Sequence, residues 1–171
     1  SGLEEGAKAI FPNVIVQRCI VHLIRNSIKY VPSKDYKTFT QAIKKVYGST
    51  NLKSAKSAFE IFEKEWSHCP GAVEVWKRNW KHVEQLFDYG SAVRRAMYTT
   101  NAIESVNSSF RKVTKKGAFP NENALLKLLY LRVTELESKW GNSRVRDWTS
   151  IMNQLLVNDQ FKHRINKYIQ Y

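Results

Sequence analysis

The sequence contains few cysteines, few acidic residues and no long apolar run. Only two cysteines occur in its 171 residues, Cys19 and Cys69, which excludes a disulfide framework and fits a reducing compartment. The longest apolar stretch, 124–136, is interrupted by Lys127 and Arg132 and is too short to span a bilayer. The first residues, SGLEEGAKAIFP, have neither the basic start nor the apolar run of a signal peptide. We therefore expect a soluble, intracellular protein of about one domain.

The shortage of acidic residues leaves a large positive charge. The chain has 28 Lys and Arg residues against 15 Asp and Glu residues, which gives a formal net charge of +13 and a pI of about 9.8. An excess of this size favours a polyanionic partner, with nucleic acid first and an acidic membrane surface second. The plain alternative is a basic soluble protein without such a partner.

One β-strand is predicted, close to the N-terminus. A helix is expected over 3–11, and Pro12 ends it. The run VIVQRCIV at 14–21 is rich in β-branched residues and mostly apolar, a pattern typical of a buried strand. From residue 20 the pattern becomes helical until Pro32.

Residues 33–90 are predicted to form an all-helical unit between Pro32 and Gly90. Apolar side chains recur there at helical spacing in three successive segments, and the turn HCPG at 68–71 separates the second segment from the third. Two amphipathic helices joined by such a tight turn should form an antiparallel hairpin.

The tryptophans of this unit have two interpretations. Trp66, Trp76 and Trp80 recur at the spacing of a helical core, where large aromatic side chains contribute most of the buried area. The alternative is an aromatic surface that stacks on DNA bases or docks another protein. The spacing favours the core.

After residue 90 the sequence predicts a short basic helix, a helix that carries Glu104, and further C-terminal helices. The segment 124–136 is apolar on nearly every side, which is typical of a helix covered on several faces. A last amphipathic pair is expected over 145–157 and 161–169. No internal repeat and no low-complexity segment occurs.

Glu104 lies in a helix that places an acid among amides and cations. At about 100° per residue, one polar face contains Glu104, Asn107, Ser108, Arg111 and Lys115. One interpretation is a capping box, in which Asn101 caps the helix and Glu104 reaches back to complement its dipole. The other is a metal ligand next to cations that hold a phosphate backbone.

Basic residues are clustered in sequence on both sides of Glu104. The clusters are Arg94 with Arg95, Arg111 with Lys112, Lys115 with Lys116, and Arg144 with Arg146. A single cation of this kind is usually a solvated surface charge, but the grouping around one acid predicts contacts with DNA phosphates from the first three clusters and Asn107. Arg25 and Asn26, one turn beyond His22, are expected to join them.

Several motifs resemble, in the same order, the C-terminal catalytic portion of bacterial Mutator-type insertion-sequence transposases. These are FPNVIVQRCIVHLIRN at 11–26, YTTNAIESVN at 98–107 with FRKVTKKGAFPNENALLKLLYL at 110–131, and RDWTSIMNQL at 146–155. The resemblance covers essentially the whole chain. It implies an enzyme that cuts and joins DNA during transposition of an insertion element. It also implies self-association in the active complex, and a place in the bacterial cytoplasm and on the nucleoid.

The resemblance also implies a fold that is mostly α. Residues 1–32 would be the edge of a partial RNase H-like core with one or few strands, 33–90 a helical insertion, and 91–171 the glutamate-bearing helix with C-terminal core helices. The family uses an Asp-Asp-Glu triad to hold two Mg²⁺ or Mn²⁺ ions, and Glu104 would be its third ligand. Both aspartates would precede Ser1, so the isolated chain is expected to be inactive and to carry no metal.

Cys19 and His22 match a Cys-x-x-His pair of the same family. The pair is half a zinc site, and His68 with Cys69 is the only second pair available, although adjacent residues rarely point at one ion. The resemblance instead implies that His22 lies near the active site and positions substrate or a metal-bound water. A histidine satisfied by a neighbouring polar group is the structural alternative.

Two other functions are consistent with the sequence. The chain could be a non-catalytic basic helical module that binds DNA or assembles transposase subunits, or a helical scaffold for protein partners. No helix-turn-helix or zinc-finger signature is present. Recognition of the element ends is therefore expected outside this chain.

Overall fold

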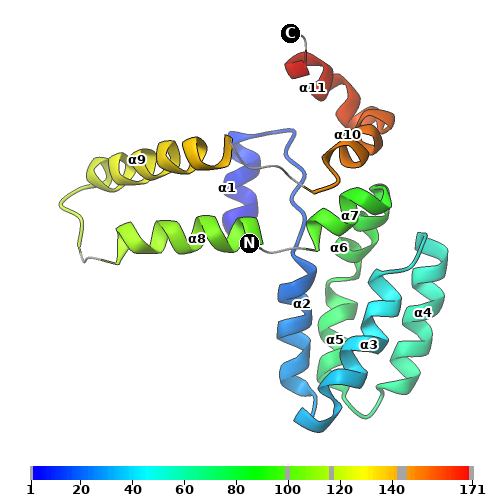
Figure 1. Ribbon diagram of the computed structural model, residues 1–171. Coiled ribbons are helices and arrows are strands. Elements are labelled where there is room, and N and C mark those ends of the chain that lie inside the picture. The colour runs from blue at the N-terminus through cyan, green and yellow to red at the C-terminus, as the bar shows by residue number, and fades with distance from the viewer. Residues whose placement is uncertain (1, 99–100, 116–117, 142–145, 170–171) are drawn as a thin grey trace. The chain divides into compact units, whose positions relative to one another are not determined.

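The computed structural model describes residues 2–98, 101–115, 118–141 and 146–169, and all their regular secondary structure is helical (Figure 1). The chain divides into two compact units, 1–98 and 99–171. The prediction of a mostly α protein is confirmed. None of the helices in the described ranges combines the length and the apolar character that a membrane crossing requires.

The first unit contains ten short helical elements. They are α1 (Gly2–Ile10), α2 (Ile20–Ser27), η1 (Ile28–Tyr30), η2 (Ser33–Asp35), α3 (Tyr36–Tyr47), α4 (Leu52–Glu65), α5 (Pro70–Arg78), α6 (Trp80–Glu84), η3 (Gln85–Asp88) and α7 (Ser91–Met97). Local chemistry sets several of their ends. Asn51 caps α4 by accepting a hydrogen bond from the Ser54 backbone N–H at 2.9 Å, and Pro70 occupies the first turn of α5.

The predicted strand at 14–21 is wrong. Residues 14–19 have no regular secondary structure, and Ile20 begins α2. A strand needs a neighbour with which to exchange backbone hydrogen bonds, and none lies beside this segment among the described residues. The strands of an RNase H-like core, expected within 1–32, are therefore not observed in the part of the chain that the structure describes.

Side-chain hydrogen bonds connect the segment 14–19 to the helices of the first unit instead. Gln17 Nε2 donates to the His82 carbonyl oxygen at 2.9 Å, and Arg18 Nη1 donates to Asn79 Oδ1 at 2.8 Å. Both partners lie at or after the end of α5. The segment is consequently held in place without a ladder of backbone hydrogen bonds.

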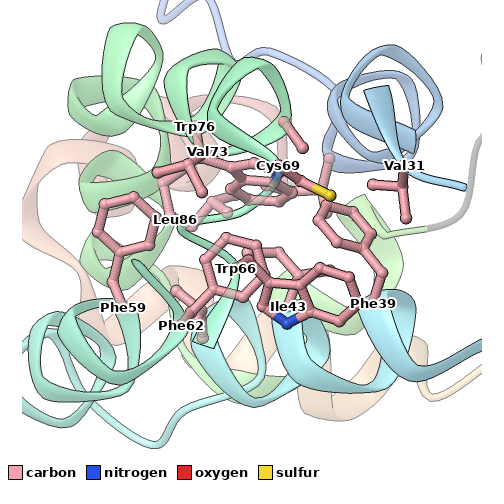
Figure 2. Close-up of a cluster of buried hydrophobic side chains, with 14 residues drawn as sticks. Val31, Phe39, Ile43, Phe59, Phe62, Trp66, Cys69, Val73, Trp76 and Leu86 are labelled. Carbon is pink, nitrogen blue, oxygen red and sulfur yellow. The ribbon is translucent and has the colours of Figure 1, made fainter. Parts of the chain in front are cut away.

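An aromatic cluster fills the core of the first unit (Figure 2). The ring of Phe39 makes edge contacts with the rings of Phe62 and Trp66, at centroid distances of 5.4 and 5.0 Å. Trp76 is completely buried, and Trp80 stacks on Phe59 at 4.4 Å. The core interpretation of the tryptophans is confirmed, and they form no exposed surface for stacking on DNA bases.

The predicted hairpin between the second and third helical segments of 33–90 is replaced by a different pairing. The closest antiparallel partners are α3 and α4, whereas α4 reaches the following helices through the ion pairs Lys77–Glu63 and Lys56–Glu84, each 2.8 Å long. The third segment is also divided, because α5 ends before Asn79. The side-chain amide of Asn79 donates to the Val75 carbonyl oxygen at 2.7 Å, in competition with helical backbone bonding.

The second unit consists of two helix pairs. Its elements are α8 (Asn101–Thr114), α9 (Glu122–Gly141), α10 (Trp148–Val157) and α11 (Asp159–Ile169). Helix α8 packs against α9, and α10 packs against α11. The last amphipathic pair is confirmed except at its start, since Arg146 and Asp147 form a turn before α10 and Val145 lies outside the described residues. The expectation that 124–136 is covered on several faces is not met, since Leu136 is its only buried side chain among the described residues and Tyr130 is 67% exposed.

Candidate nucleic-acid interface

Glu104 lies in the first turn of α8 and is half-buried. Its neighbours on the polar face are exposed: Asn107, Ser108, Arg111 and Lys115. Helix α8 thus places one carboxylate near its N-terminus and Arg111 farther along the same face, and Lys115 follows directly after the end of the helix at Thr114. The capping alternative is not tested, because the side chain of Asn101 lies outside the described residues.

The predicted cations on α8 are accessible to a ligand. Arg111, Lys112 and Lys115 are exposed, and Lys116 lies outside the described residues. The helix is amphipathic: the apolar side chains Val106 and Phe110 are half-buried, whereas the cations remain exposed to water. The amphipathic pattern read from the sequence is thus sufficient to place these cations.

A polar hollow of about 360 Å³ lies between α8 and α9, beside the Glu104 face. It is lined by Ser105, Ser108, Ser109, Lys112, Arg132, Glu135, Leu136 and Lys139. Ser108 belongs both to the hollow and to the predicted polar face. The single acid in the lining, Glu135, is ion-paired to Arg132, which also donates to the Ser109 hydroxyl. Hydroxyls and cations therefore dominate the hollow, and such groups bind phosphate oxygens.

The sequence prediction missed the cations that α9 contributes to this hollow. Arg132 and Lys139 lie on α9, well after the α8 face in sequence, so no local cluster marks them. Their i, i+7 spacing places both on one side of α9 and is the signal that was available. Recognising it required knowing that α9 packs beside α8.

The other predicted site residues lie in the first unit. His22, Arg25 and Asn26 are exposed on α2, and Arg95 is exposed on α7. These residues belong to the first unit, whereas Glu104 belongs to the second. Their prediction as catalytic or DNA-contacting residues stays a prediction.

Arg94 has a different environment from the other predicted cations. It is 7% exposed, and its guanidinium donates to the carbonyl oxygens of Ser49 at 2.8 Å and Thr50 at 3.2 Å. The guanidinium carbon also lies 4.8 Å from the ring centroid of Phe87. Arg94 therefore stabilises the turn between α3 and α4, and it is not among the side chains that we propose to contact DNA.

The residues considered for zinc are separated by burial and position. Cys69 is buried in the aromatic core, and Cys19 precedes α2 and is half-buried. Within the described ranges, no three His, Cys, Asp or Glu side chains come together as a metal site would require. Glu104 therefore belongs to no group of three or more potential metal ligands within the described residues.

Together these features define a basic, helical protein with a helix, α8, that carries one carboxylate and exposed cations. A family model for transposases of the Mutator family matches residues 1–143, and the chain belongs to this family. The resemblance read from the motifs is thereby confirmed.

Several curated transposases are similar to this chain. It is 39% identical over 159 residues to the transposase for insertion sequence element ISRM3 of Rhizobium meliloti, covering 91% of this chain and 40% of the relative. It is 38% identical over 148 residues to a probable insertion-element transposase of Corynebacterium diphtheriae, covering 85% and 43%. A transposase for element IS256 of Staphylococcus aureus is 28% identical over 143 residues, covering 81% and 36%. The chain spans about two-fifths of the length of these relatives.

Proposed function

We propose that this chain is the glutamate-bearing portion of a transposase that cuts and joins DNA during transposition of an insertion element. The observation that carries the proposal is the α8 face, where Glu104 is followed by Asn107, Arg111 and Lys115 in a chain of the Mutator family. The named relatives are transposases for insertion elements, which supports the same activity.

Glu104 is proposed as one ligand of a catalytic divalent metal. A single carboxylate cannot hold such an ion, and no acidic cluster joins Glu104 within the described residues. We therefore propose that the other two carboxylates of an Asp-Asp-Glu triad come from the remainder of the transposase, and that this chain alone does not cleave DNA. Bound Mg²⁺ or Mn²⁺ would supply activation of the attacking oxygen and stabilisation of the leaving oxygen.

The cations of α8 and α9 are proposed to grip the DNA backbone beside the scissile bond. Arg111 and Lys115 share the face of Glu104, and Lys112 lies in the adjoining hollow with the α9 cations. Contacts of this kind fix the register of the duplex without reading its sequence. They would hold a phosphodiester next to the carboxylate.

A second candidate function is a non-catalytic module that binds DNA or assembles transposase subunits. The lack of an acidic cluster in the described residues favours it for the isolated chain. The two functions differ in metal dependence, since a binding module needs no Mg²⁺. A protein scaffold that docks partners through its tryptophans is not favoured, because Trp66 and Trp76 are in the core.

The DNA-gripping role of α8 is tested by fluorescence anisotropy with a labelled duplex over a range of salt concentrations. We expect Arg111→Gln with Lys115→Gln to raise Kd about tenfold or more near physiological salt, and to lower the salt slope by about two. The matched control removes the same charge at two exposed positions of the first unit, Lys37 and Lys53. Equal losses in both double variants would contradict a specific α8 contact.

A further inference from the structure

A second cation-lined hollow, of about 430 Å³, lies in the first unit where α2 and η1 meet α5. Its polar lining consists of Arg18, Asn26, Lys29, Tyr30, Arg78 and Asn79. The buried side chain of Val75 completes it. Only Asn26 among these residues was predicted from the sequence to contact nucleic acid.

Hydrogen bonds hold the hollow in shape. Arg18 Nη1 donates to Asn79 Oδ1 at 2.8 Å, and Asn79 Nδ2 donates to the Val75 carbonyl oxygen at 2.7 Å. These two bonds fix the orientation of the Asn79 amide and the direction of the Arg18 side chain. The arginine is consequently positioned before any ligand arrives, which lowers the entropic cost of binding.

The aromatic ring at the rim of the hollow is also held in position. Tyr30 is 56% exposed, yet its ring lies directly against the backbone of Gly71. A Cβ atom at Gly71 would come within 2.7 Å of a Tyr30 ring carbon, so only glycine allows this approach without a shift. The ring therefore presents a supported aromatic surface beside the cations.

The lining of the hollow carries an excess of positive charge. Arg18, Lys29 and Arg78 contribute three positive charges, and no carboxylate lines the hollow. Glu74 pairs with Arg78 at 3.4 Å on the exposed surface. Lys8, the partner of Glu4, lowers the pKa of that carboxyl most, and Arg18 lies close enough to help lower it. Such exposed pairs contribute little, so the mutual repulsion of the three cations is relieved best by a bound anion.

We propose that this hollow binds a phosphodiester group of the DNA backbone, with Tyr30 against the adjoining sugar or base. Cations paired with amide groups match the contacts that proteins make to phosphate oxygens, and an exposed supported aromatic ring suits base stacking. The choice of DNA as the ligand rests on the proposed function. The hollow adds a DNA contact in the first unit that is independent of α8. A membrane headgroup fits less well, because Tyr30 is the only exposed aromatic or apolar side chain in the lining, which is too little to anchor the hollow in a bilayer.

The test compares two double variants of the chain by anisotropy with a labelled duplex. Lys29→Gln with Arg78→Gln leaves the structural bond between Arg18 and Asn79 intact, and it should raise Kd about tenfold or more and lower the salt slope by about two. The control, Lys37→Gln with Lys53→Gln, should change Kd by less than about threefold. Unchanged thermal unfolding would show that both variants fold.

Tyr30→Ala tests the stacking contact separately from the charge of the hollow. Loss of a stacking surface should raise Kd about fivefold while leaving the salt slope unchanged, because no phosphate contact is removed. The proposal for the hollow is overturned if Lys29→Gln with Arg78→Gln changes Kd no more than the control does. It is likewise overturned if that variant loses binding only to phosphatidylserine vesicles and not to DNA.

The outcomes also separate this inference from the proposed function. If Arg111→Gln with Lys115→Gln weakens DNA binding and Lys29→Gln with Arg78→Gln does not, only the inference about the hollow fails. In the opposite case, the proposed contact of α8 with the DNA backbone fails and the inference about the hollow stands. Absence of salt-dependent DNA binding by the unmodified chain would overturn both.

Discussion

Arg94 and Arg111 belong to similar basic clusters in the sequence, but their surroundings give them opposite roles. Arg111 is exposed on α8, where a ligand can reach it, whereas Arg94 is buried and donates to two backbone carbonyl groups. A charge cluster in a sequence predicts that cations are near one another along the chain. It does not predict which of them the fold will use for its own hydrogen bonds, because that depends on the turn at 49–50.

The role of Arg94 is testable by its effect on stability. We expect Arg94→Leu to lower the free energy of unfolding by about 2–3 kcal/mol, because the carbonyl oxygens of Ser49 and Thr50 would lose their charged donor. Arg95→Leu, at the exposed neighbouring position, should change it by less than about 0.5 kcal/mol. Urea denaturation measures both, and equal effects would contradict the structural role of Arg94.

At the scale of elements, hydrophobic periodicity was enough to predict most helices. Within 33–90, the apolar spacing of the first two predicted segments, 36–46 and 52–66, corresponds to α3 and α4. The helix expected over 3–11 from its composition and Pro12 corresponds to α1. Two features were not predictable in this way. The strand at 14–21 required a partner that the described structure lacks, and the break at Asn79 depends on a side-chain hydrogen bond that periodicity does not register.

Capping gives the most direct test of an element boundary. Asn51→Ala should destabilise the first unit by about 1 kcal/mol, because the Ser54 N–H at the start of α4 would lose its acceptor. Asn51→Asp keeps an acceptor oxygen and should be close to neutral. Thermal unfolding of both variants checks this boundary, and a loss of the same size in both would show that the cap is not the cause.

At the scale of the whole molecule, the sequence motifs indicated the family and the glutamate helix, whereas the two hollows required coordinates. The α8 face follows from helical spacing within one segment, so it could be predicted from the sequence. The hollows combine residues from different elements, such as Lys112 with Lys139 and Arg18 with Arg78. Their assembly depends on tertiary packing, which a single sequence does not report.

The proposed role of Glu104 as a metal ligand of a transposase is tested by a cleavage assay. A transposase of the relatives' full length that carries this chain is assayed for Mg²⁺-dependent cleavage of an element-end duplex, unmodified and as Glu104→Gln. DNA affinity and thermal unfolding are measured on the same proteins. Glutamine preserves size and hydrogen bonding in a capping box but removes the charge that a divalent ion requires.

We expect Glu104→Gln to abolish cleavage while DNA affinity and the unfolding temperature stay unchanged. Cleavage that remains intact, with at most a small loss of stability, would make Glu104 a helix-capping residue. That result would contradict the proposed role of the α8 face in catalysis.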